Sequence, residues 1–152
     1  MQYFSGTNIA YFGSIEGHGP CLFSGDTLFS TGCGRLFEGS PSQMHTSLQK
    51  LAALPSATSI FCAHEYTLAN LAFAKAVMPD SAQVQNRINQ CQKIRARNEP
   101  TLPARLGEEL TYNPFLMSDD EQVIVAAKSR LGHTPHNNTE VFTTIRQWKD
   151  QF

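Results

Sequence analysis

The sequence predicts an α/β, layered first part followed by a second part built only from helices. Three observations support this prediction. Apolar runs of strand length occur only before residue 64, one helical pattern lies between two of them, and every pattern after residue 66 is helical. Hydrophobic residues make up 41% of the 152 residues and charged residues 16%, a composition that suits a packed core rather than a disordered chain.

The strands are predicted from short apolar runs that end at turn residues. These runs are residues 8–12, 20–24 and 58–62. Two glycines and a proline within residues 14–20 predict that the first two strands form a hairpin. A glycine-rich loop at 32–39 follows the second strand.

A helix is predicted between this loop and the third strand. Ser40 can cap it, Pro41 suits its first position, and Gln43 completes a capping box. Pro55 ends it. Its apolar face consists of Met44, Leu48, Leu51 and Leu54. We expect His45, on the same helix, to lie at the surface.

The second part is predicted to be helical throughout. The helical segments are 67–77, 81–98, 118–131 and 138–151. Ser118 is the expected cap of the third of these, and 100–114 is expected to be an irregular, proline-rich connector without strands. We therefore expect two domains, at 1–64 and 65–152.

Charge and cysteine content limit the classes of protein. A net charge of −1 gives no basic field for nucleic acid or an anionic membrane. No apolar stretch reaches the length of a membrane span, and the first residues lack the features of a signal peptide. The four cysteines, Cys21, Cys33, Cys62 and Cys91, form no C-x-x-C pair, which indicates a reducing, cytoplasmic compartment. We expect Cys21 and Cys62 to be core residues.

Two potential metal ligands follow strand ends. Asp26 follows the strand at 20–24, and His64 follows the strand at 58–62. An oxygen and an imidazole nitrogen suit zinc, iron or manganese, and a carboxylate can bridge two such cations. From these two residues alone, a turn-capping aspartate and an ordinary loop histidine are the better interpretation.

The other histidines are weaker candidates. His18 lies in the predicted hairpin turn. His133 and His136 flank Pro135 between two predicted helices. Their H-x-x-H spacing could bind a metal, but a polar loop is the better interpretation of the sequence.

Several short sequence motifs follow one another along the chain: G-D-T-L-F at 25–29, G-C-G-R-L-F-E-G at 32–39, H-E-Y-T at 64–67, P-T-L-P at 100–103, N-P-F-L at 113–116 and R-Q-W-K-D at 146–150. Together they resemble the motifs of the glyoxalase II (hydroxyacylglutathione hydrolase) family of the metallo-β-lactamase superfamily. The resemblance implies that residues 1–64 are the C-terminal half of a metallo-β-lactamase αββα sandwich. It implies that 65–152 are a helical domain that binds glutathione conjugates.

The family resemblance also implies an activity and a set of site residues. The family hydrolyses S-D-lactoylglutathione, a small-molecule thioester, to D-lactate and glutathione at a two-metal, typically zinc, centre, in the detoxification of methylglyoxal. Asp26 matches the residue that bridges both metals, and His64 matches a ligand of the second. The residues that match glutathione contacts are Arg35, Phe37, Tyr66, Arg146 and Lys149. Phe37 has no phenolic hydroxyl, so we expect it to contribute packing only.

The sequence departs from the family pattern in its metal ligands. The T-H-x-H-x-D-H word is absent, and the stretch 4–9, where a further histidine is expected, contains none; Asn8 is a poor substitute. Two protein ligands are too few for a catalytic zinc. We therefore expect a truncated chain that is a poor catalyst by itself. The alternative is an inactive glutathione-conjugate-binding remnant, or an association module that pairs through an uncovered sheet face and edge.

Overall fold

The computed structural model describes residues 2–5 and 8–152, and it has mixed α/β content with a small sheet beside six α-helices. The strands are β1 (Gln2–Ser5), β2 (Asn8–Ile15), β3 (Gly19–Gly25), β4 (Leu28–Phe29), β5 (Gly32–Cys33), β6 (Ser59–Cys62) and β7 (Ala104–Arg105). The helices are α1 (Pro41–Ala52), α2 (Thr67–Val77), α3 (Ala82–Ala96), α4 (Leu106–Tyr112), α5 (Glu121–Leu131), α6 (Asn138–Asp150) and the 3₁₀ helix η1 (Pro114–Leu116).

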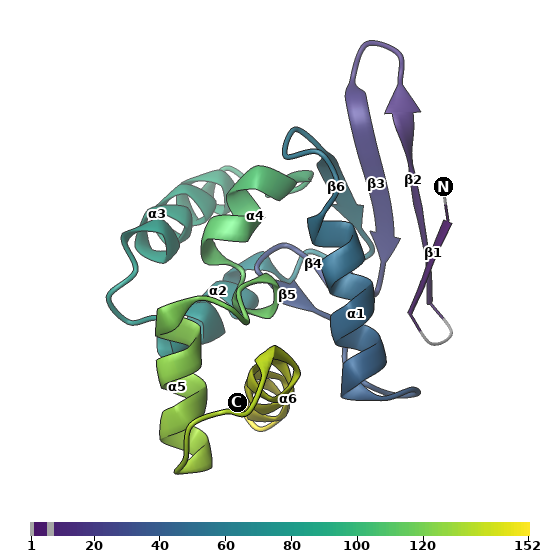
Figure 1. Cartoon of the computed structure of the whole chain (residues 1–152). Helices are drawn as coiled ribbons and strands as arrows, with labels where there is room; N and C mark the ends of the chain where they lie inside the picture. Colours follow the sequence, from purple (N-terminus) through teal and green to yellow (C-terminus); the bar gives the residue numbers. More distant parts are fainter. Residues whose placement is uncertain (1, 6–7) are drawn as a thin grey trace.

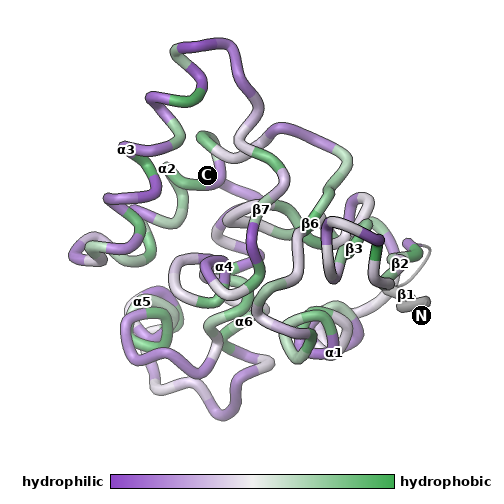
Figure 2. The backbone as a smooth tube through the Cα atoms, turned by 90° about the horizontal axis from the view of Figure 1, so that it is seen from above, coloured by the Kyte–Doolittle hydropathy of each residue, from purple (hydrophilic) through white to green (hydrophobic). Residues whose placement is uncertain are grey.

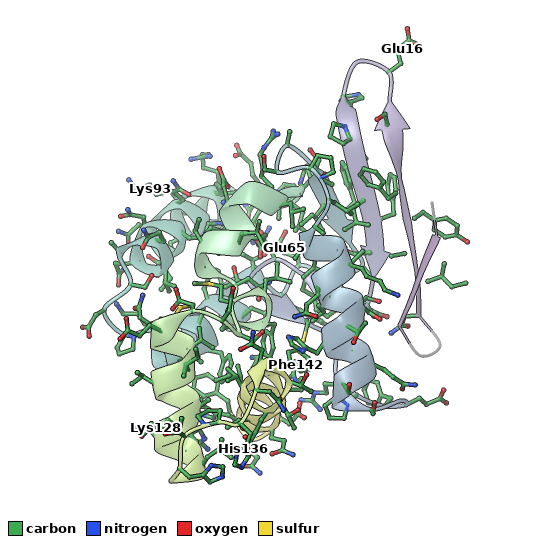
Figure 3. The ribbon with its side chains drawn as sticks, viewed as in Figure 1. Glu16, Glu65, Lys93, Lys128, His136 and Phe142 are labelled. Atoms are coloured by element: carbon green, nitrogen blue, oxygen red, sulfur yellow. The ribbon has the colours of Figure 1, made fainter. Side chains whose placement is uncertain are left out.

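The main sheet has five strands in the order β1-β2-β3-β6-β7. Strands β1, β2 and β3 are joined as an antiparallel meander, whereas β3 and β6 are parallel and are connected through α1. The β2–β3 hairpin extends beyond the rest of the molecule (Figure 1), with Glu16 at its tip (Figure 3). The three predicted strands and the predicted hairpin are confirmed, and β1 was not predicted.

One face of the sheet is covered and the opposite face is open. Leu22 and Ile60 are fully buried and belong to one hydrophobic cluster with Leu48 and Leu51 of α1, which crosses this face (Figure 1). Large apolar side chains on the opposite face remain 38–51% exposed: Ile9, Tyr11, Ile15, Phe23 and Phe61. The register pairs Tyr11 with Phe23 and Phe23 with Phe61, so that aromatic residues form a row across three strands. An exposed apolar face of this kind was expected from the sequence.

The hydrophobic cluster continues from the sheet into the helices. Phe73, Phe115 and Phe142 are fully buried members from α2, η1 and α6, and Phe142 is seen between helices in Figure 3. Figure 2 shows hydrophilic stretches along the outer helix α3 and in the peripheral loops. Sheet and helices therefore share one core.

The capping box predicted for α1 is confirmed, but the prediction for His45 is wrong. Ser40 accepts the Gln43 N–H, and Gln43 accepts the Ser40 N–H. His45 is 4% exposed, because α6 and the segment before α5 pack against α1. Its ring nitrogens lie 2.8 Å from the Ser118 hydroxyl and 3.1 Å from the Thr139 hydroxyl.

The helices α2, α3 and α6 agree with their predicted positions, but two other predictions for the second part are wrong. The stretch 100–114 contains β7 and α4, because Ala104 and Arg105 pair with β6 and Leu106 is buried. Ser118 does not cap α5; Asp120 does so, by accepting the Gln122 N–H at 2.9 Å. The pairing of β7 with β6 is tertiary and leaves no local signal in a short, proline-punctuated segment. The Ser118 hydroxyl is instead partnered with His45, and the cap lies two residues further on.

The cysteine predictions differ in outcome. Cys21 is buried at 1% exposure, as predicted. Cys62 is only partly buried, because it ends β6 where the sheet edge opens. Both are free thiols, as are Cys33 and Cys91.

Candidate functional site

Two parallel strands bring Asp26 and His64 together. Strands β3 and β6 are neighbours, so the residues that follow their carboxyl ends lie at one edge of the sheet. Gly25 ends β3 with a left-handed φ of 52°, a conformation that glycine adopts without strain, and its carbonyl accepts the Ala63 N–H. The Asp26 Oδ1 and His64 Nε2 atoms lie 3.3 Å apart, and both side chains are about half exposed.

An aromatic stack fixes the His64 ring. Tyr66 stacks on it with ring centroids 4.8 Å apart, and Phe29 packs edge-on against Tyr66 at 5.2 Å. Tyr66 stands directly before α2, as its N-cap residue. The H-E-Y-T word thus supplies both the imidazole and the ring that orients it.

The glycine-rich loop approaches the same edge. The Gly34 N–H donates to the Thr27 carbonyl at 3.1 Å, and a Cβ at Gly34 would collide with the Asp26 carbonyl oxygen. Only glycine fits there, which places Arg35 and Phe37 next to the Asp26 side of the site. Phe37 is 87% exposed and forms the rim.

The turn that leads into this loop is held by a buried carboxylate. Glu109 of α4 is fully buried and accepts the Ser30 hydroxyl at 2.8 Å, the Thr31 N–H at 2.7 Å and the Asn113 amide at 3.0 Å. Burial raises the pKa of Glu109. Asn70 of α2 donates to the Ser30 carbonyl at 3.1 Å. Sequence reasoning missed this support, because Glu109 lies in the supposed connector.

Arg146 lies at the floor of the site as a structural clamp. It is 3% exposed, and its Nη1 donates to the Cys33 carbonyl at 2.9 Å. Nε and Nη2 both donate to Asp150, at 3.1 and 2.8 Å, and the guanidinium lies 4.9 Å from the Phe115 ring centre. Most of its donors are therefore used within the protein, and it holds the glycine-rich loop against α6.

Lys149 and Arg35 are cations of the site without an ion-pair partner, since no ion pair to either occurs among residues 8–152. Burial, followed by the neighbouring Arg146 and Arg35 charges, lowers the pKa of Lys149. Lys149 also lies 5.4 Å from the Phe73 ring centre. These groups form a cationic wall that suits an anionic ligand.

A cavity of about 520 Å³ connects these groups. Its lining includes all seven site residues predicted from the sequence: Asp26, Arg35, Phe37, His64, Tyr66, Arg146 and Lys149. Asn8 lines it as well, at the position where the sequence suggested a lost histidine. Residues 6 and 7, in the stretch compared with that histidine word, lie outside the described residues.

The donor set of this cavity suits a metal but is small. Asp26 and His64 provide a carboxylate oxygen and an imidazole nitrogen, whose 3.3 Å separation matches two ligands of one tetrahedral ion. Cys33 also lines the cavity, but burial raises the pKa of its thiol to about 11, so it is not a ready thiolate ligand. The described residues thus offer a partial ligand set.

These features define an α/β protein with a ligand site at the carboxyl ends of two parallel strands, closed on one side by helices. Residues 65–152 match the family described as "Hydroxyacylglutathione hydrolase C-terminus". The chain belongs to the hydroxyacylglutathione hydrolase family.

Curated relatives carry the same family name over nearly the whole chain. A hydroxyacylglutathione hydrolase of Hahella chejuensis is 57% identical over 145 residues, which cover 95% of this chain and 56% of the relative. Relatives of that name from Aeromonas hydrophila and Pseudomonas aeruginosa are 52% and 50% identical, and 55% of each is covered. The chain therefore spans about half the length of the curated relatives it matches.

In the described part of the chain, no helix is both long and apolar enough to cross a bilayer.

Proposed function

We propose that the chain serves as the C-terminal portion of a hydroxyacylglutathione hydrolase, which converts S-D-lactoylglutathione to D-lactate and glutathione. The observation that carries this proposal is that one cavity holds both the Asp26–His64 pair and the unpaired cations Arg35 and Lys149. The names of the curated relatives support the same reaction.

Substrate binding would depend on the cationic wall. A glutathione conjugate carries two carboxylates, and such groups are best held by Arg or Lys donors from separate elements. Arg35 on the loop and Lys149 on α6 meet that requirement, since neither has an ion-pair partner among residues 8–152. Tyr66 and Phe37 would pack against the apolar parts of the conjugate, and Arg146 would act by holding the loop that carries Arg35.

Asp26 and His64 would hold the metal, and zinc fits an oxygen–nitrogen pair. A bound metal pair supplies Lewis-acid polarisation of the thioester carbonyl. The net reaction adds water to the thioester: the acyl carbon gains a C–O bond, the C–S bond breaks, and the sulfur leaves as the thiol. Tyr66 would keep the His64 ring in position throughout, through the stack described above.

We further propose that residues 1–64 form half of a metallo-β-lactamase sandwich and that 65–152 form its helical partner domain. The exposed row of Tyr11, Phe23 and Phe61 supports packing of a second layer on that face. Further metal ligands would then come from that second layer. Four free cysteines support a reducing compartment such as the cytoplasm.

The partial ligand set favours a second candidate function, a glutathione-conjugate-binding module without catalysis. Both candidates predict little or no turnover by this chain alone, because two protein ligands hold a catalytic zinc poorly. They differ in what happens when more ligands are supplied. In the first, the N-terminal half of a relative restores metal binding and turnover; in the second, it does not.

The test combines elemental analysis with a hydrolysis assay on S-D-lactoylglutathione. Each is run on this chain alone and after mixing with the N-terminal half of the Hahella chejuensis relative. Metal uptake and turnover only in the mixture support the hydrolase. Stoichiometric metal and rapid turnover by the chain alone would refute the idea that its ligand set is partial. Neither metal nor turnover in the mixture would favour the binding module.

The role of the cationic wall is tested separately by calorimetric titration with glutathione. Lys149→Met is expected to weaken binding about tenfold, because one charge-assisted contact is lost. Lys128→Met, which changes an exposed lysine on α5 outside the cavity, is the matched control and is expected to bind as the parent does. Equal affinities for the two variants would show that the cationic wall does not contribute to glutathione binding.

A further inference from the structure

A second group of metal-binding side chains lies at the connection between α5 and α6. His133, His136 and Glu140 each bring one ligand atom within 4.8 Å of the others. None of the three lines the cavity that holds Asp26 and His64, and His136 lies at the end of the molecule opposite the hairpin tip (Figure 3). Both histidines are exposed and Glu140 is half-buried. The sequence showed only the H-x-x-H spacing; the folded chain adds the carboxylate.

Two of the three ligand side chains, His133 and Glu140, have a second contact that orients them. His133 Nδ1 lies 3.0 Å from the Thr134 carbonyl oxygen, so this nitrogen carries the proton and leaves the Nε2 lone pair free. Glu140 Oε2 accepts the His136 N–H at 2.6 Å, which leaves Oε1 free. Partnered second atoms of this kind are the usual surroundings of metal ligands.

The two free atoms, one on His133 and one on Glu140, do not form a hydrogen bond with each other. His133 Nε2 and Glu140 Oε1 are 3.9 Å apart, which is too long for a hydrogen bond. The two imidazole rings lie with centroids 5.4 Å apart. Ligands of one tetrahedral zinc ion are about 3.3 Å apart. A small contraction would therefore bring two nitrogens and one oxygen to a common ion.

The backbone around the site limits its freedom. Glu140 sits in the first turn of α6, where its N–H donates to the Asn137 cap at 2.9 Å. Pro135, between the two histidines, has a fixed φ. The helix therefore provides a rigid position for the carboxylate, and the short loop provides the two imidazoles.

We propose that His133, His136 and Glu140 form a surface site for Zn²⁺, separate from the Asp26–His64 pair, with water in the remaining coordination position. Two imidazoles and a carboxylate are a donor set that zinc accepts. Bound zinc would tie the α5–α6 loop to the first turn of α6, the helix that carries Arg146 and Lys149. The zinc site would thus stabilise α6, which forms the floor of the cavity that holds Asp26 and His64.

The experiment is a calorimetric titration with zinc chloride, in a buffer free of chelators, on the His64→Ala variant. That background weakens the other candidate metal site, so the remaining zinc is assigned to this one. Adding His136→Ala or Glu140→Gln is expected to lower the zinc affinity about tenfold or more. Glu140→Gln keeps a carbonyl oxygen for the His136 N–H, so the loop is preserved. His18→Ala, in the exposed hairpin turn, is the matched control.

Histidine NMR on the His64→Ala chain provides a second readout that needs no further variant. The chain has five histidines, and four remain in this background. Zinc is expected to shift the imidazole signals of His133 and His136 and to leave those of His18 and His45 in place. Unmoved His133 and His136 signals, or zinc affinity unchanged by both His136→Ala and Glu140→Gln, would overturn the proposal.

Discussion

Replacing Arg146 with methionine should destabilise the protein, because Arg146 acts as a structural clamp. The side chain is buried and reaches the Cys33 carbonyl at 2.9 Å and the Asp150 carboxylate at 2.8 Å. Methionine keeps most of the apolar stem but has neither the donors nor the guanidinium that lies over the Phe115 ring. The change therefore removes the hydrogen bonds and preserves much of the packing.

The magnitude follows from the surroundings of each partner. The Cys33 carbonyl loses a charged donor in a buried position, which costs about 1.5–3 kcal/mol. The Asp150 side chain is 40% exposed and stays solvated, so loss of that pair costs only about 0–1 kcal/mol. With the lost cation–π contact, we expect a total decrease of about 3 kcal/mol in the free energy of unfolding.

Urea denaturation of the parent and two variants measures this effect. With a slope of about 2 kcal/mol per molar urea, the midpoint for Arg146→Met should fall by about 1.5 M with the slope unchanged. Lys149→Met is the matched control on the same helix. Its charged form is disfavoured in the fold, since burial lowers the pKa of Lys149, so removing that charge should change stability by less than about 0.5 kcal/mol. A midpoint for Arg146→Met equal to that of the parent, or a larger loss for Lys149→Met, would refute the clamp.

Three other predictions concern the core, the sheet face and pH. Burial lowers the pKa of His45 from 6.5 in the folded chain, so the stability that the neutral imidazole contributes is complete above pH 6.5 and is lost as the pH falls. The difference in unfolding free energy between the parent and His45→Gln should therefore shrink from about pH 7 to about pH 5. A difference that stays constant with pH would contradict this. Phe73→Ala should cost about 3–5 kcal/mol, read as a lower thermal midpoint, because Phe73 is fully buried among aromatic rings; a loss below about 1 kcal/mol would show that the core had closed over the gap. If the open sheet face drives self-association, light scattering should detect dimers of the parent at high concentration and monomers of the double variant Phe23→Lys, Phe61→Lys; identical masses would exclude that face.

The main elements could be predicted from local patterns because their signals are contained in neighbouring residues. The hairpin follows from two apolar runs around a glycine-rich turn, and α1 follows from Ser40, Pro41 and a periodic apolar face. The positions of Asp26 and His64 after two strand ends were also visible in the sequence. Their proximity then depended only on β3 and β6 being parallel neighbours.

The supports of the site could not be predicted, because their partners are distant in the sequence. Glu109 bonds to Ser30 and Thr31, almost eighty positions away, from a segment that showed no helical pattern. His45 looked like a surface residue until α6 covered it. In each case the cost of burying a polar side chain is offset by hydrogen-bond partners that only the packed chain brings near.

The sequence alone determined the family resemblance, the order of the longer helices and of β2, β3 and β6, and seven of the residues that line the cavity. Only the tertiary structure decided which cation holds the loop and which is left for a ligand, since Arg146 and Lys149 are three residues apart on one helix and look alike as a pattern. It also decided that Glu140 joins His133 and His136. The physical reason is the same in both cases: the environment of a charge is set by what packs around it, and that is a property of the folded chain.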